Sequence, residues 1–230
     1  METLHEFMLI TKGREYLIAI GFLVFFILFW IYLGKTQALA SPIRALRLDD
    51  LRLKKKMYFH RSHTWLVPGL FGGNLIGIDD FLDKLAGALH EIKVPATGSS
   101  INRGDPLFAL DLGSRTINVL APVSGTVTMI NPKMYQQSYH PQLGTQKANW
   151  LIRLEPSNWE KESADLTSTT TAGEWLKGEV DRFRQFLDSQ GERPTIAPVT
   201  LADGGDPVMG VLQLLDGEGI QQFENDFLKT

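Results

Sequence analysis

The 230-residue sequence predicts a mainly β domain, a small barrel or sandwich with flanking helices, preceded by one transmembrane helix. Two observations carry this prediction. Short apolar runs punctuated by Gly and Pro follow residue 57, without the long alternating helices of a βαβ sheet. Before them, residues 16–34 form an uncharged run of 19 residues.

The run "YLIAIGFLVFFILFWIYLG" is bracketed by Glu15 and Lys35. As a helix it would cross roughly 30 Å of hydrocarbon, at about 1.5 Å per residue. A buried core helix would have polar residues on one face. "ALAS" at 38–41 resembles a signal-peptide cleavage site, but the apolar run exceeds the usual core of about 7–15 residues. We therefore expect a retained single anchor.

Basic residues set the expected orientation. Two Lys or Arg precede the run after residue 10, and seven follow it up to Lys56. The positive-inside rule then places the C-terminal body in the cytoplasm, which predicts a single-pass protein of a bacterial inner membrane. Residues 35–57 form a basic juxtamembrane linker, and "SPIRALRLDDLRLKKK" is typical of a short amphipathic helix against lipid or a partner.

The body follows as strands and two main helices. The predicted strands lie within 64–69, 75–78, 91–96, 106–113, 116–130 and 150–156. "DDFLDKLAGALH" at 79–90 predicts a helix capped by Asp79 or Asp80, and capping and dipole matching explain its acidic cluster with Asp83. "EWLKGEVDRFRQFLDSQG" predicts an amphipathic helix over 174–190 that Gly191 ends.

The predicted organisation has five parts: a short N-terminal segment (1–15), the transmembrane helix (16–34), the linker (35–57), the β domain (58–190) and a C-terminal extension (191–230). The extension is unusually apolar for a solvated terminus. It either packs on its own domain or binds a partner. The predicted partner-binding residues are Leu214, Leu215, Phe223, Phe227 and Leu228.

Composition and motifs exclude several functions. A net charge of −3 argues against a nucleic-acid binder, and the absence of cysteine removes disulfides, thiolate metal sites and cysteine nucleophiles. His60 and His63 lack a third metal ligand and would diverge on extended chain, so they are interpreted as surface or packing residues. No nucleophile and base emerge as a set. The sequence predicts no enzyme, no metal and no cofactor.

Four motifs in order carry a resemblance: "HTW" at 63–65, "IGIDDFLDKLAG" at 76–87, "APVSGTV" at 121–127 and "WLIRLEP" at 150–156. Together they resemble the H-protein of the glycine cleavage system, a member of the biotinyl/lipoyl-carrier fold family, over roughly residues 58–190. The resemblance implies a flattened β-barrel that presents a lysine at a hairpin turn. In that family the lysine carries lipoate, which shuttles an aminomethyl group between enzymes.

The expected lysine is missing. The family places it seven residues before the alanine of the "APVSG" segment, which in this chain gives Ser114, with Arg115 beside it. No lysine lies between Lys93 and Lys133. A hydroxyl without an adjacent base is a weak nucleophile, and arginine stays protonated. The sequence therefore predicts that the fold is kept and the carrier chemistry is lost.

The predicted function is a non-catalytic, non-lipoylated accessory or scaffold subunit of a cytoplasm-facing membrane complex, with respiratory or other electron-transfer complexes as one candidate class. Its partners would be other subunits and the lipid bilayer. One alternative is a membrane-tethered lipoyl or biotinyl carrier modified at an atypical lysine, Lys93 or Lys133. Another is a membrane-fusion adaptor of an export system, although such adaptors split the lipoyl halves around a long coiled coil.

Overall fold

The computed structural model describes residues 15–16, 18–29, 57–69, 73–113, 115–135, 149–190 and 207–229. The chain divides into two compact units, Met1–Ile43 and Arg44–Thr230. In the first unit, residues 18–29 are helical with exposed side chains. Phe22 stacks on Phe26 and Phe25 on Phe29, with ring centroids 6.2 and 6.1 Å apart, as expected at i,i+4 spacing.

Within the described ranges, no helix combines the length and the apolar character that a membrane crossing needs. Residue 17 and residues 30–34 of the predicted anchor lie outside the described residues, as do 1–14 and the linker up to 56. The transmembrane helix therefore stays a prediction.

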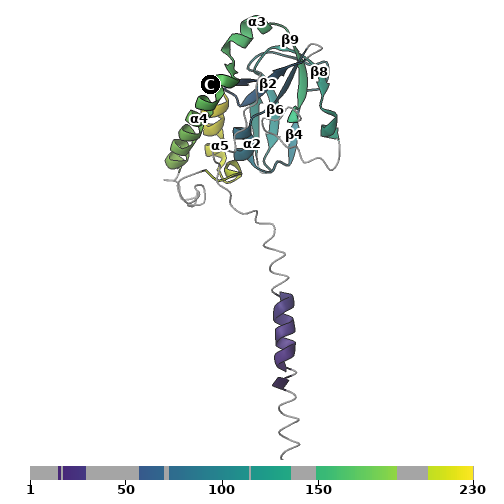
Figure 1. Ribbon diagram of the computed structural model, residues 1–230, viewed down its shortest axis with the longest axis vertical. Coiled ribbons are helices and arrows are strands. Elements are labelled where there is room, and N and C mark those ends of the chain that lie inside the picture. Colours follow the sequence, from purple (N-terminus) through teal and green to yellow (C-terminus); the bar gives the residue numbers. More distant parts are fainter. Residues whose placement is uncertain are drawn as a thin grey trace, which may run out of the picture. The chain divides into compact units, whose positions relative to one another are not determined.

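The second unit contains two antiparallel sheets (Figure 1). The larger has the strand order β10-β1-β2-β3-β9-β8-β5, and the smaller has β4-β6-β7. The strands are β1 Tyr58–His60, β2 Thr64–Pro68, β3 Asn74–Ile78, β4 Glu91–Lys93, β5 Ser100–Ile101, β6 Pro106–Asp111, β7 Thr116–Leu120, β8 Gly125–Ile130, β9 Ile152–Pro156 and β10 Thr167–Ser168. Every predicted strand segment thus contains an observed strand, and the mainly β fold class is confirmed.

Alternating side chains place the core between the sheets. In β7, Ile117 and Val119 are fully buried, while Thr116 and Asn118 are exposed. Ile76 and Ile78 of β3 enter the same core from the larger sheet. A period of two residues is what one buried and one solvated face of a strand require.

The helices flank the sheets. They are α2 Asp80–Ala86, α3 Trp159–Glu162, α4 Thr169–Gln190 and α5 Gly217–Phe223, with 3-10 turns η2 Pro132–Tyr135, η4 Ser163–Asp165 and η5 Val211–Gln213 and a π-helical turn η6 Glu224–Leu228. Figure 1 shows α4 and α5 next to each other on one flank, with α2 between them and the strands. The predicted cap of α2 is confirmed, because the Asp79 side chain accepts a hydrogen bond from the Leu82 N–H.

Helix α4 begins five residues before the predicted start. Its first turn is Thr-rich, and β-branched residues are weak helix formers, so the sequence alone argues against a helix there. A tertiary contact overrides this preference. The Thr169 hydroxyl donates to the Met57 carbonyl at 2.8 Å, and the Met57 N–H donates back to that hydroxyl at 3.0 Å. Met57 is 3% exposed, so it belongs to the folded domain rather than to the linker.

The C-terminal extension is part of the same core. Its residues 191–206 lie outside the described residues. Of the five residues predicted to bind a partner, four are buried against the domain itself: Leu215 is 1%, Phe223 0%, Phe227 2% and Leu228 1% exposed. Leu214, at 49%, is the one that faces solvent. The partner surface predicted over these four residues is therefore corrected to an intramolecular packing surface.

Backbone contacts fix the extension to α2. Gly87 and Gly210, both with positive φ, approach so closely that a Cβ on Gly87 would lie 2.7 Å from the Gly210 Cα. The Gly210 N–H donates to the Lys84 carbonyl at 2.8 Å. The Gln213 side chain donates to the carbonyl of Ala86 at 2.8 Å. These contacts satisfy carbonyls that the short helix leaves without an internal partner.

Candidate functional site

The β6–β7 hairpin occupies the position at which the resemblance implies a carrier lysine. Asp111 of β6 pairs with Thr116 of β7, and the Leu112 N–H donates to the Arg115 carbonyl at 2.7 Å to close the turn. Gly113 has φ +95°, and a Cβ there would lie 2.8 Å from the His90 ring. The turn is therefore tight, and the His90 ring packs closely against it. Ser114 itself lies outside the described residues.

The C-terminal extension holds this hairpin. The Arg115 guanidinium donates to the Leu215 carbonyl, 100 residues away in sequence. Three residues after Arg115, the exposed backbone N–H of Asn118 donates to the Glu224 carboxylate at 2.7 Å. Strand β7 is an edge of the smaller sheet, so Glu224 satisfies a donor that would otherwise have no strand partner. The hairpin thus serves as a docking surface for the chain's own C-terminus.

The two lysines nearest in sequence lie on other elements. Lys93 is in β4, paired with Ala109 of β6, and its side chain is 68% exposed. Lys133 is in the η2 turn after β8. Neither is at the hairpin tip. In sequence the turn contains Ser114 and Arg115, and the Arg115 guanidinium is already bound to the extension.

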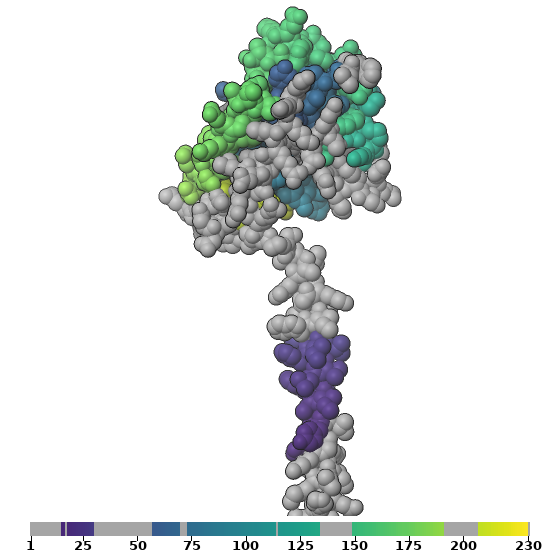
Figure 2. Space-filling view, in the orientation of Figure 1, coloured from purple at the N-terminus to yellow at the C-terminus, as the bar shows by residue number. Residues whose placement is uncertain are grey.

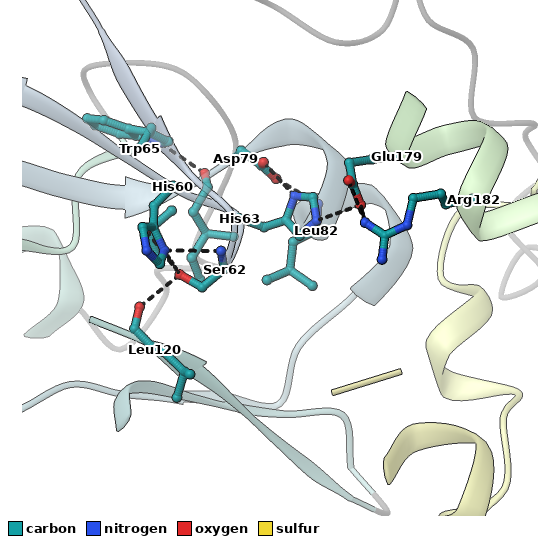
Figure 3. A network of polar contacts seen from close by, with 11 residues as sticks. His60, Ser62, His63, Trp65, Asp79, Leu82, Leu120, Glu179 and Arg182 are labelled. Atoms are coloured by element: carbon teal, nitrogen blue, oxygen red, sulfur yellow. Dashed lines mark hydrogen bonds and ion pairs between the residues drawn. The ribbon is translucent and has the colours of Figure 1, made fainter. Parts of the chain in front are cut away.

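A second polar cluster lies at the turn between β1 and β2 (Figure 3). His63 is fully buried and has φ +59°, a left-handed conformation that costs free energy for a residue other than glycine. Its ring lies between Phe81, at 4.4 Å, and Trp175, at 5.3 Å between centroids. Nδ1 bonds to the Asp79 carboxylate at 2.8 Å, so this aspartate both caps α2 and orients the imidazole.

The other ring nitrogen of His63 faces helix α4. Nε2 is 3.9 Å from the Glu179 carboxylate and makes no hydrogen bond within the part of the chain that the structure describes. Glu179 is 6% exposed and is bound by the Arg182 guanidinium at 2.7 and 2.9 Å. The Asp79, His63, Glu179 and Arg182 side chains therefore form a continuous polar chain from α2 to α4, as Figure 3 shows.

His60 points away from this chain, as predicted, but residues 61–63 form a turn and not the extended chain from which that divergence was predicted (Figure 3). Its Nδ1 accepts the Ser62 backbone N–H at 3.1 Å. Burial, with the positive charge of Arg103 adding to it, lowers the pKa of His60 to about 4 from an ordinary 6.5. His60 is therefore neutral at physiological pH. No cluster of three metal-ligating side chains exists among the residues with described positions.

Burial disfavours the ionised form of the Asp83 carboxyl group at neutral pH. Burial raises its pKa to about 6 from an ordinary 3.8; the charges of Asp80 and Asp79 add to this, and Lys84 opposes it. The native state therefore binds a proton that the unfolded chain releases between pH 3.8 and 6. Stability falls as pH rises through that window. Asp79 caps α2 and Asp83 lies in its first turn, where the helix dipole favours a negative charge, but burial of Asp83 outweighs that effect.

We therefore expect Asp83→Asn to stabilise the protein by about 1–2 kcal/mol at pH 7.5, since it removes a partly buried charge. The gain should shrink at pH 5, where the native carboxyl is mostly protonated. Urea unfolding of the variant and the parent at both pH values measures this. Glu91→Gln, which removes a 59% exposed charge, is the control and should change little. A gain that is the same at both pH values would contradict the explanation.

Sequence reasoning located Arg115 at the hairpin but missed the contacts of His63, Glu179 and Arg182. The spacing of 16 residues between His63 and Asp79 is not a recognised motif. Glu179 and Arg182 at i,i+3 are typical of an exposed helix pair. Only the left-handed turn that drives His63 inward brings these groups together, and no local pattern of residues 60–64 indicates it.

Comparison with known proteins agrees with the fold and the motif order. Residues 57–179 match a family model described as "Glycine cleavage H-protein". Residues 1–36 match a second model, described only as "Protein". A "Probable glycine cleavage system H protein" of Thermococcus kodakarensis is 28% identical over 134 residues, which cover 57% of this chain and 98% of that protein.

A second relative points the same way. A "Glycine cleavage system H protein" of Carboxydothermus hydrogenoformans is 33% identical over 142 residues, covering 60% of this chain and 96% of that protein. The crystal structure of a glycine cleavage system H protein from Mycobacterium marinum superimposes with a TM-score of 0.40 and 19% identity, over 46% of this chain and 87% of that one. The first 56 residues and the C-terminal extension lie outside the matched domain.

Proposed function

Because the chain belongs to the glycine cleavage H-protein family, we propose that it keeps the family fold as a binding module and does not act as a carrier. It would serve as a non-catalytic, non-lipoylated accessory subunit of a membrane complex. The observation that carries this proposal is the hairpin. Ser114 stands where the resemblance implies the acylated lysine, and the neighbouring Arg115 is bound to the Leu215 carbonyl.

Carrier chemistry requires a free, flexible arm at the hairpin tip. Here the hairpin is bound at two points by the C-terminal extension, through Arg115 and through the Asn118 N–H. Each charge-assisted hydrogen bond of this kind contributes roughly 1.5–3 kcal/mol. A hairpin that is ordered by its own chain supports a structural role for this surface.

The membrane attachment rests on the apolar run at 16–34 and on the excess of basic residues after it. We expect the body in the cytoplasm of a bacterial cell. Protease added to spheroplasts should leave the body intact and digest it only after the membrane is permeabilised. Digestion in intact spheroplasts would reverse the topology. The assignment to a respiratory or other electron-transfer complex stays a prediction.

Restoring the lysine tests the loss of carrier function. We expect a lipoate ligase to leave the parent chain unmodified and to acylate Ser114→Lys, because that substitution returns an amine to the register of the family. Intact-mass analysis detects the added acyl group. Arg115→Lys, one residue out of register, is the matched control. Acylation of the parent chain would contradict the proposal.

The second candidate function is a lipoyl or biotinyl carrier that uses an atypical lysine. The matched relatives, which are named as glycine cleavage system H proteins, favour it. Lys93 is an accessible choice, because its side chain is 68% exposed on β4, and Lys133 is exposed as well. Loss of an acyl group from native protein on Lys93→Arg substitution would establish this candidate in place of the first.

A further inference from the structure

A cavity of about 370 Å³ opens between the β1–β2 turn and helix α4. Its lining residues are Arg61, Trp175, Glu179 and Arg182. Three of them come from α4, spaced four and three residues apart, so they share one face of the helix. Figure 2 shows α4, in green, on the surface of the body. The volume is within the range of small-molecule sites.

Two residues of the cavity wall, Trp175 and Glu179, are supported by the buried His63 side chain. The buried His63 ring stacks on Trp175 at 22° between planes, and its Nε2 lies 3.9 Å from Glu179. Since His63 is itself bonded to Asp79, the wall is tied to α2. A wall that does not have to be ordered on binding favours affinity.

The guanidinium of Arg182 is also held in place. It bonds to Glu179, donates to the Asp226 carbonyl at 2.8 Å and lies 4.9 Å from the Phe227 ring centroid. Glu179 is thereby neutralised within the protein. Arg61 is different, because it is exposed and makes no hydrogen bond or ion pair with any residue of described position. Two guanidiniums against one carboxylate leave the cavity with an excess positive charge.

The geometry points to a binding site for a small organic carboxylate with a planar body. The guanidinium of Arg61 would donate two parallel, charge-assisted hydrogen bonds to the ligand carboxylate. The indole of Trp175 would supply a flat apolar surface for the body of the ligand. This site is independent of the proposed accessory role and of the hairpin. Glu179 is the last residue of the matched family domain, and Arg182 lies beyond it.

Benzoate is a suitable probe, with benzamide as its uncharged counterpart. Ligand-observed NMR on the full chain in mild detergent, with a detergent blank, measures saturable binding. We expect benzoate to bind and benzamide not to bind at up to about 10 mM, a weak-fragment range. Arg61→Gln should weaken benzoate binding at least about tenfold, the value of one lost charge-assisted hydrogen bond.

Lys177→Gln is the matched control, because Lys177 is exposed on the same helix and does not line the cavity. It should leave benzoate binding unchanged. Arg61→Gln removes a side chain without partners among the described residues, so its unfolding midpoint should equal that of the parent. Absence of saturable benzoate binding, equal binding by Arg61→Gln, or equal binding of benzamide would each overturn the assignment.

Discussion

Truncation after Gly191 should abolish the stable fold of the domain. It removes eight side chains that are each no more than 5% exposed: Val208, Val211, Leu212, Leu215, Ile220, Phe223, Phe227 and Leu228. Burial of one such side chain contributes roughly 1.5–3 kcal/mol. Even the lower value, taken over the group, is comparable with a typical net stability of about 5–15 kcal/mol. The truncated body also exposes α4 and the edge of β7.

Thermal unfolding and light scattering of the truncated chain, residues 1–191, measure this effect. We expect aggregation or loss of the cooperative transition. Leu214→Ser is the control, since Leu214 is the 49% exposed residue of the same segment and should tolerate a polar side chain. A truncated body that keeps its melting temperature and loses only its co-purifying partners would restore the alternative in which the extension binds a partner, and would contradict intramolecular packing.

Phe183→Ala should cost about 3–5 kcal/mol of unfolding free energy. Phe183 is fully buried at the centre of an aromatic cluster that joins α2, α4 and the extension. Its ring centroid lies 5.9 Å from that of Phe81, 5.8 Å from Phe223 and 5.6 Å from Phe227. Edge-to-face geometry adds about 0.5–1.5 kcal/mol to a pair beyond its buried area. The alanine leaves a cavity that three separate elements cannot close together.

Urea unfolding of Phe183→Ala and of the double variant with Phe223→Ala measures both the loss and the coupling. The two substitutions should cost less together than the sum of their separate costs, because each removes the same ring contact. Lys177→Ala, on the exposed face of α4, is the control and should stay within about 0.5 kcal/mol. A loss below 1 kcal/mol for Phe183→Ala would contradict the role of the cluster.

Local patterns predict the strands and α2 because those elements depend on neighbouring residues. Alternation at Ile117 and Val119 marks a half-buried strand, and Asp79 ahead of an apolar periodic run marks a helix start. The start of α4 was predicted wrongly because its Thr-rich first turn is stabilised by Met57, 112 residues away. The residues close to Thr169 in sequence give no information on that contact, because Met57 is so far away along the chain.

The apolar character of the extension was evident, but its docking surface was not. Arg115 meets Leu215 and Asn118 meets Glu224 across 100 and 106 residues. Apolar residues indicate that a segment is buried, but they do not indicate which surface it packs against. That Ser114 stands at the carrier-lysine position stays a prediction, because it rests on the register that the family resemblance implies. The buried position of His63 depends on a left-handed turn at φ +59°, which the residue type does not indicate.

The intact mass of the full chain purified from its native membranes tests the central claim most directly. Electrospray mass spectrometry, followed by peptide mapping across residues 91–135, covers Lys93, Ser114 and Lys133. The proposal predicts the unmodified sequence mass, with no acyl group on any lysine. A lipoyl or biotinyl increment located on Lys93 or Lys133 would contradict it and establish the chain as a carrier.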